Sequence, residues 1–350
     1  MIRILLIADS HLGFDLPLRP RILKNRRGED FFDNYRKALK PAFQKKVDAI
    51  VHGGDLLFRS RVSARLVDRA MQPLKELGDL GVDVFLVPGN HERARIPYGI
   101  LCLHPRIHIF NYPRTFIYEK NGTRIGFVGF PFQRGNIRSS FPHILLNTGW
   151  QDAMKKCRVF FLCVHHCFEG ATVGPGNFTF KNSEDVIRHE DVPDNFTAVL
   201  SGHIHRAQIL TKNLRGRMLK VPIFYPGSLE RTSFAEMKER KGFIILNLFP
   251  GEHADKRLLT WKFQALTARP MNIIKLSASG MDPDRMKIAL RKYLESVEPN
   301  SIVRLDLYGP LDQRCFSVLQ AASLRKFCPP QMSVSVRLRD PEDRFRIGGL

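Results

Sequence analysis

Five apolar runs of strand length in this chain each lead into a polar segment that contains Asp, Asn or His. These runs span residues 2–8, 49–52, 82–87, 159–164 and 197–200. Between the first three lie longer segments with helical spacing of apolar residues, such as 31–46 and 64–80. Strands that alternate with helices predict an α/β sheet that is buried on its faces. In such sheets ligands bind beyond the carboxyl ends of the strands, so these polar segments predict a site.

The polar residues at the strand ends are of the types that bind metal ions. The segments read "ADSH", "GGDLLF", "PGNHE", "VHH" and "GHIH" in chain order. They supply Asp9, His11, Asp55, Asn90, His91, His165, His166, His203 and His205. A lone histidine is more often a structural residue than a ligand. Carboxylates gathered at one rim, however, would repel each other unless cations held them, so the whole set predicts a metal centre.

The number of these residues favours two divalent metals. They are too many for a four-coordinate structural zinc site. Carboxylate, amide and imidazole ligands suit Mn²⁺, Fe²⁺ or Zn²⁺, with Mn²⁺ or Mg²⁺ favoured as oxygen ligands increase. Two such ions can clamp both oxygens of an in-line displacement at phosphorus, with Asp55 as a central bridge. His91 would then face the substrate, where it could stabilise the transition state or protonate the leaving alkoxide.

His203 and His205 lie two residues apart, directly after an apolar run and Gly202. Residues i and i+2 of a strand point the same way. Gly202 has no side chain, so the backbone can pass tightly there and both imidazoles can converge on one point.

Two domains are expected. From about residue 116 the pattern changes to antiparallel pairs: "TFIYEKNGTRIGFVGF", with a turn at Asn121 and Gly122, then "ILTKNLRGRMLKVPIFYPG" and "KGFIILNLFPGEHADKRLLTWKF". A break follows near 267–270. Strands at 272–277, 302–307 and 333–338 then alternate with helices at 283–296 and 313–326. We therefore expect a large domain over 1–266 and a small one over 271–350.

The formal net charge of +21 favours a polyanionic partner, nucleic acid before an anionic membrane surface. The segment from Arg19 to Lys46 contains ten basic residues and only three acidic residues. Beside the ligand motifs stand Arg59, Arg61, Arg93 and Arg95, where a phosphate backbone would run. Solubility alone is the competing explanation, because charge runs are usually solvated surface.

No signal peptide, membrane span or CxxC pair is evident, so a cytoplasmic protein with reduced cysteines is expected.

The ordered set "DSH…GGDLLF…PGNHE…VHH…GHIH" resembles the calcineurin-like metallophosphoesterases. The segment "FYPGSLERTSFAEMKERKGF" at 224–243 is similar to that of the SbcD-type DNA double-strand-break repair nucleases. The resemblance implies a β-sandwich flanked by helices, in four layers α/β/β/α, with a small α+β C-terminal capping domain. It also implies a cytoplasmic, nucleoid-associated homodimer that acts on DNA with an SbcC-type coiled-coil ATPase.

The resemblance further implies roles for individual residues. One metal, usually Mn²⁺ in this family, would be held by Asp9, His11, Asp55 and His205. The other would be held by Asp55, Asn90, His165 and His203, with His166 as the alternative to His165. His91 would be the catalytic histidine.

The leading hypothesis is a two-metal DNA exonuclease and endonuclease that acts at DNA ends. A phosphodiesterase or phosphatase for small molecules would use the same centre, and the charge and the extra lobe speak against it. A non-catalytic DNA-binding scaffold would predict a degraded ligand set, whereas this set is intact.

Overall fold

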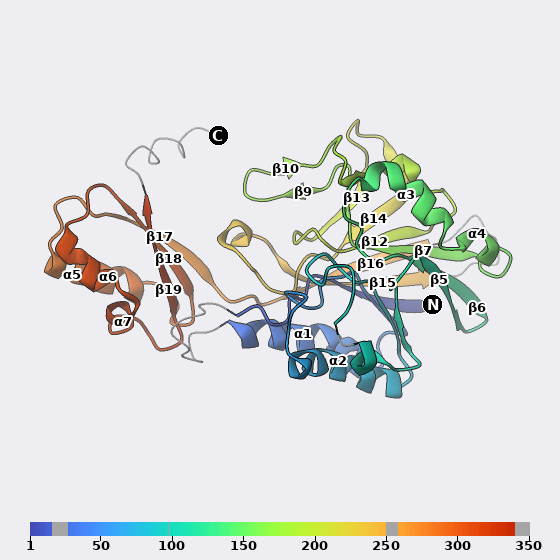
Figure 1. The fold of residues 1–350 in the computed structure, drawn as a ribbon, viewed down its shortest axis with the longest axis horizontal. Helices are drawn as coiled ribbons and strands as arrows, with labels where there is room; N and C mark the ends of the chain where they lie inside the picture. The colour runs from blue at the N-terminus through green and yellow to red at the C-terminus, as the bar shows by residue number, and fades with distance from the viewer. Residues whose placement is uncertain (16–26, 98, 250–257, 340–350) are drawn as a thin grey trace. The chain divides into compact units, whose positions relative to one another are not determined.

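The structure is a computed structural model that describes residues 1–15, 27–97, 99–249 and 258–339 (Figure 1). The first part of the basic run, from Arg19 to Arg26, lies outside the described residues. The chain divides into two compact units. The first consists of Met1–Phe14 and Asp30–Ala268, and the second contains the remaining described residues, chiefly those from Arg269 onward.

The first unit contains two six-stranded sheets. The first sheet has the spatial order β16 (Leu258–Leu266), β15 (Lys241–Phe249), β1 (Ile2–Ile7), β2 (Ala49–His52), β3 (Asp83–Leu86) and β4 (Ile107–Ile109). Strands β1 to β4 are parallel, and β15 and β16 add an antiparallel pair at one edge. Helices α1 (Gly28–Phe43) and α2 (Ala64–Asp79) make the connections from β1 to β2 and from β2 to β3. The predicted alternation of strands and helices is thus confirmed.

The second sheet also mixes parallel and antiparallel strands. Its order is β13 (Gln208–Lys212), β14 (Met218–Tyr225), β12 (Ala198–Ser201), β7 (Val159–Val164), β6 (Thr123–Gly129) and β5 (Arg114–Lys120). The four inner strands are parallel, and β13 and β5 run antiparallel at the edges. Asn121 and Gly122 have φ angles of +50° and +73° between β5 and β6, as the predicted hairpin turn requires.

Shorter elements complete this unit. The second sheet is accompanied by helices α3 (Ile137–Leu146) and α4 (Trp150–Ala153). Loop segments form β8 (Cys167–Phe168), β9 (Thr172–Val173), β10 (Phe178–Thr179), β11 (Val186–Ile187), η2 (Gly99–Cys102), η3 (His189–Asp191) and η4 (Phe234–Glu236).

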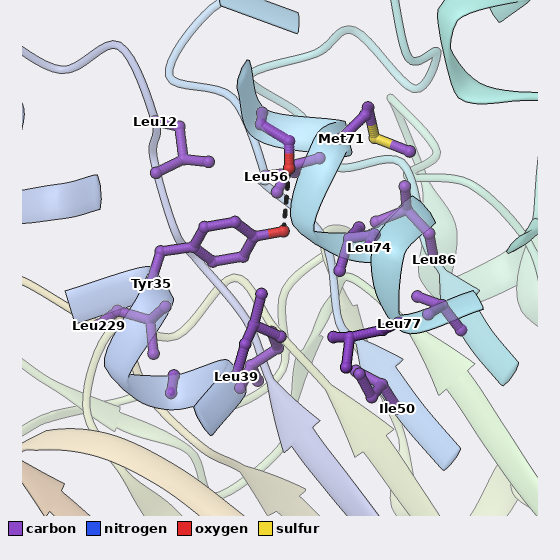
Figure 2. Packing of buried hydrophobic residues seen from close by; sticks show 14 of the residues in the cluster. Leu12, Tyr35, Leu39, Ile50, Leu56, Met71, Leu74, Leu77, Leu86 and Leu229 are labelled. Atoms are coloured by element: carbon purple, nitrogen blue, oxygen red, sulfur yellow. Dashed lines mark hydrogen bonds between the residues drawn. The ribbon is translucent and has the colours of Figure 1, made fainter. Parts of the chain in front are cut away.

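The alternation of side chains along each strand builds the layers. In β1, Leu5 and Ile7 pack in the cluster that contains residues of α1 and α2, whereas Ile4 and Leu6 face the cluster between the sheets. Figure 2 shows the helix side of this core, where the buried Tyr35 hydroxyl donates to the Ala70 carbonyl at 3.1 Å. A third cluster joins the second sheet to α3 and α4. The predicted four-layer α/β/β/α fold is therefore confirmed.

The second unit is built on a parallel three-stranded sheet, β17 (Met271–Ser277), β18 (Ile302–Tyr308) and β19 (Ser333–Arg339). Helix α5 (Pro283–Glu295) begins at the N-cap Asp282, whose carboxylate accepts from two backbone N–H groups. The prediction of one helix at 313–326 is wrong, because the segment forms η5 (Gln313–Cys315), α6 (Phe316–Leu319) and α7 (Ala321–Leu324). Gln320 has extended backbone, with φ −61° and ψ 144°, and this interrupts the helix.

Among the described residues no disulfide joins any of the six cysteines, and five of them are buried. Among the described residues, none of the helices has the length and apolar character that crossing a membrane requires.

Candidate metal centre

The predicted ligands converge because both sheets end at one place. Asp9 and His11 follow β1, Asp55 follows β2, and Asn90 follows β3. From the second sheet, His165 follows β7, and His203 and His205 follow β12. Strand ends that are far apart in sequence thus contribute to one rim of the sandwich.

The first group of ligand atoms comes from Asp9, His11 and His205, and these atoms lie within 4.8 Å of one another. Nε2 of His11 lies 2.9 Å from Nε2 of His205. Nε2 of His205 lies 4.0 Å from Oδ1 of Asp9. Since the two imidazole nitrogens face one another beside a carboxylate, one cation could accept all three side chains.

Asp55 links this group to a second one. Its Oδ2 lies 4.0 Å from Nε2 of His11 and 3.3 Å from Nε2 of His165. Oδ1 of Asn90 lies 2.9 Å from both Nε2 of His165 and Nδ1 of His203. Asp55 therefore lies between the two groups, in the position that a bridging ligand would take.

The two adjacent histidines of "VHH" have different surroundings. The ring of His165 points into the cluster, and its Nδ1 donates to the Gly53 carbonyl at 2.8 Å. His166 instead accepts a hydrogen bond from the backbone N–H of Gln133 at 3.1 Å and stacks on Phe132. The geometry thus places His165, and not His166, beside the other predicted ligands.

Glycines allow close approaches at this rim, both between the two sheets and between neighbouring loops of the first sheet. A Cβ on Gly202 would lie 2.4 Å from the Gly53 carbonyl oxygen, and one on Gly89 would lie 2.1 Å from Oδ1 of Asp55. The tight passage expected at Gly202 is therefore confirmed. Asp9 and Asp55 adopt φ angles of +49° and +52°, which non-glycine residues rarely adopt. Such backbone strain clusters at functional sites.

The electrostatics of the site fit divalent cations. Oδ2 of Asp9 is buried without a hydrogen-bond partner in the described part of the chain, and a bound cation would satisfy it. Burial raises the pKa of Asp9. Burial alone would raise the pKa of Asp55 too, but the charge of His165 holds it well below its ordinary value. Although burial opposes it, the Asp55 carboxylate raises the pKa of His165 to about 9. Oxygen and imidazole donors of this kind suit Mn²⁺, Fe²⁺ or Zn²⁺.

His91 lies at the open side of the cluster. Its Nδ1 donates to the Phe58 carbonyl at 2.6 Å, so Nε2 is the free ring nitrogen and lies 3.9 Å from Oδ2 of Asp55. The side chain of His91 is 33% exposed, whereas that of Asp55 is 2% exposed. His91 can therefore reach a ligand that approaches from solvent.

The four predicted DNA-contacting arginines are all exposed: Arg59, Arg61, Arg93 and Arg95. The first two follow the Asp55 loop, and the others follow His91. The guanidinium of Arg59 lies 5.6 Å from the ring centroid of Phe58.

Sequence reasoning missed the residues that hold these loops. Both carboxylate oxygens of the buried Glu92 accept backbone hydrogen bonds, from Leu57 and from Gly89, each at 2.7 Å. The Ser10 hydroxyl and Nε2 of His52 pair at 2.8 Å beneath the first loop. Glu92 stands next to His91 in the "PGNHE" motif, but only the fold shows what its carboxylate contacts.

This fold and this rim of Asp, Asn and His define a metal-dependent phosphoesterase architecture. The calcineurin-like phosphoesterase family model matches residues 2–207. The chain belongs to this family, and the predicted resemblance is confirmed.

Curated relatives extend the comparison. The chain is 26% identical over 258 residues to the DNA double-strand break repair protein Mre11 of Methanocaldococcus jannaschii, covering 71% of this chain and 63% of the relative. It is 24% identical over 342 residues to Mre11 of Methanosarcina acetivorans, and this alignment covers 97% of this chain and 50% of the relative. The chain thus spans about half to two thirds of these relatives. A solved dimetal phosphatase from Danio rerio is 15% identical, with a TM-score of 0.43 over 74% of this chain and 98% of that one.

Proposed function

We propose that this protein is a two-metal-dependent DNA nuclease, an exonuclease and endonuclease that hydrolyses phosphodiester bonds at DNA ends during repair. The observation that carries the proposal is the convergence of five strand ends, from two sheets, on one cluster of buried and half-buried Asp, Asn and His side chains. The names of the Mre11 relatives support the repair role.

The residues divide between two metal positions. Asp9, His11, Asp55 and His205 would hold one ion, and Asp55, Asn90, His165 and His203 would hold the other. Bound there, divalent cations supply Lewis acidity, which polarises a phosphate and makes a water molecule a stronger acid. Mn²⁺ is the expected ion, and Mg²⁺, Fe²⁺ and Zn²⁺ are the alternatives.

His91 acts on the substrate. Its Nδ1–H is committed to the Phe58 carbonyl, so Nε2 faces the reacting phosphate. As an imidazolium, Nε2–H can stabilise the added negative charge of the transition state and then give its proton to the leaving alkoxide. The attacking water oxygen forms a new P–O bond and its proton passes to solvent, while the bond to the leaving oxygen breaks and that oxygen takes the proton from His91.

Charge favours DNA over a small phosphate ester. The chain carries +21, and four exposed arginines flank the ligand loops. Phosphate contacts from Arg59, Arg61, Arg93 and Arg95 would give affinity that depends on salt and not on base sequence. We assign residues 1–266 to the nuclease domain and 271–350 to a capping domain. A homodimer with an SbcC-type ATPase partner in the cytoplasm, at the nucleoid, completes the proposal.

Digestion of end-labelled linear duplex DNA with Mn²⁺, with and without a chelator, tests the function against an Asp55→Ala control. Chelator-sensitive loss of label that the control lacks is the expected result. Intact DNA with binding retained would favour the scaffold hypothesis. Intact DNA without binding would favour a small-molecule phosphoesterase.

A further inference from the structure

The segment between β14 and β15 returns to the metal centre and packs under His205. The backbone N–H of Ser228 donates to the His205 carbonyl at 3.1 Å, and Nζ of Lys241 donates to the same carbonyl at 3.0 Å. A Cβ on Gly227 would lie 2.8 Å from this oxygen. This segment is the "YPGSLERTSFAEMKERKGF" motif, which the proposed function leaves without a role.

The contact that matters most is between Glu236 and the ring of His205. Oε1 of Glu236 lies 3.1 Å from Nδ1 of His205. A carboxylate only accepts hydrogen bonds, so Nδ1 must carry the proton and Nε2 of a neutral ring must be bare. That bare nitrogen faces Nε2 of His11 at 2.9 Å and Oδ1 of Asp9 at 4.0 Å. The carboxylate therefore selects the tautomer that can bind a cation at this point.

Glu236 is itself held from several sides. Its Oε1 also accepts from the Thr232 hydroxyl at 2.6 Å, and its Oε2 accepts from Nζ of Lys241 at 2.5 Å. Lys241 is 1% exposed, and its ammonium donates to Glu236, to the Ser228 hydroxyl and to the His205 carbonyl. Every proton of this buried ammonium thus has an acceptor.

A buried ion pair of this kind gives little net stability compared with apolar residues of the same volume. A precise geometry for His205 is a better explanation of it. His165 and His91 donate Nδ1–H to backbone carbonyls, whereas His205 is oriented by an ionised side chain. A carboxylate partner also raises the basicity of an imidazole ligand.

We propose that Glu236 is a positioning residue that sets the tautomer and orientation of His205, and that Lys241 and Ser228 hold Glu236 in place. Through His205 it controls the affinity of the metal position that Asp9, His11 and His205 share. This inference rests on the proposed two-metal function.

The test is calorimetric titration of the metal-stripped full chain with Mn²⁺. Glu236→Ala should weaken one of two binding events about 10- to 100-fold and leave the other unchanged. Glu119→Ala is the control, because it removes a carboxylate whose ion pair with Arg124 is exposed to solvent. It should change neither event by more than about threefold.

Glu236→Ala leaves the Lys241 charge buried and could impair folding. The double variant Glu236→Leu, Lys241→Met removes both charges at similar volume and should show the same selective loss. In a His205→Ala background the double variant should cause no additional loss, because both act through one imidazole.

Wild-type affinity at both positions in a folded variant without the Glu236 carboxylate would overturn the inference and leave the proposed function standing. Equal weakening of both positions would also overturn it, since that indicates a general structural role. Failure of the wild-type chain to bind Mn²⁺ would instead overturn the two-metal function itself.

Discussion

Glu92 ties the loop after β3 to the loop after β2, because its Oε1 accepts a hydrogen bond from the backbone N–H of Leu57 at 2.7 Å. Its Oε2 accepts from the backbone N–H of Gly89, also at 2.7 Å. One buried carboxylate thus holds the loops that carry Asp55 and Asn90. The side chain sets the geometry of the metal centre without belonging to the predicted ligand set.

Replacement of Glu92 by Gln should destabilise the protein. The amide has one acceptor oxygen, so a buried N–H group would face an NH₂ group and lose its hydrogen bond. We expect the free energy of unfolding in urea at pH 7 to fall by about 1–3 kcal/mol. Glu119→Gln, which disrupts an exposed pair with Arg124, should change it by less than about 1 kcal/mol. Equal effects of the two changes would contradict the role of Glu92.

Replacement of His91 by Asn should slow catalysis without removing metal. The change deletes the ring nitrogen that faces the substrate, so kcat for DNA cleavage should fall about 10²- to 10⁴-fold. Metal content after dialysis should match that of the wild type. His143→Asn on the exposed part of α3 should leave the rate unchanged. A lost metal ion in His91→Asn would show that His91 is a ligand.

Arg59 and Arg61, which follow the Asp55 loop, should contribute to the salt dependence of DNA binding. For Arg59→Ala, Arg61→Ala we expect the slope of log K against log salt to become less negative by about 0.9 for each phosphate that is no longer neutralised. Fluorescence anisotropy with labelled duplex in chelator measures binding without cleavage. The control Arg215→Ala, Arg217→Ala removes the same charge from an exposed turn between β13 and β14. If both pairs shift the slope equally, net charge alone explains the binding.

The core beneath α2 should be sensitive to truncation. Leu77 is fully buried in the cluster of Figure 2, so Leu77→Ala should lower the free energy of unfolding by about 2–5 kcal/mol. Leu80 is 51% exposed, and Leu80→Ala should cost about 0.5 kcal/mol or less. Urea denaturation of both variants measures these free energies. A large loss of stability in Leu80→Ala would contradict the assigned exposure of Leu80.

Asp83 should contribute stability that depends on pH. Burial alone would raise the pKa of Asp83, but hydrogen bonds from His108 and Arg106 hold it below its ordinary value of 3.8. Because the pKa of Asp83 is lower in the folded state than in the unfolded state, the ionised carboxylate stabilises the fold at pH values above 3.8. This stabilisation is lost as the pH falls from 3.8 through the lower pKa of the folded state. Asp83→Asn should therefore lower the free energy of unfolding in urea by about 1 kcal/mol near pH 6 and by progressively less below pH 4. A difference that stays constant between pH 6 and pH 3 would exclude this linkage.

The ends of the strands, and with them the types of residue at the site, could be predicted from the sequence alone. Apolar runs and helical spacing depend on local burial, and local burial repeats along a strand or a helix with a period that can be read directly. The positions of Asp9, Asp55 and His205 after such runs were therefore predictable, as was the hairpin turn at Asn121. The prediction of one helix over 313–326 was wrong because no helix-breaking residue in the sequence indicates that the backbone of Gln320 is extended.

The contacts between these side chains, in contrast, depend on the tertiary fold. It separated His165 from His166, which the doubled motif left open, because one ring faces Asn90 and the next faces Gln133. It also brought Glu236 to His205 across 31 positions of sequence. Such contacts depend on how two sheets pack, and side-chain packing between distant segments leaves no periodic trace in the chain.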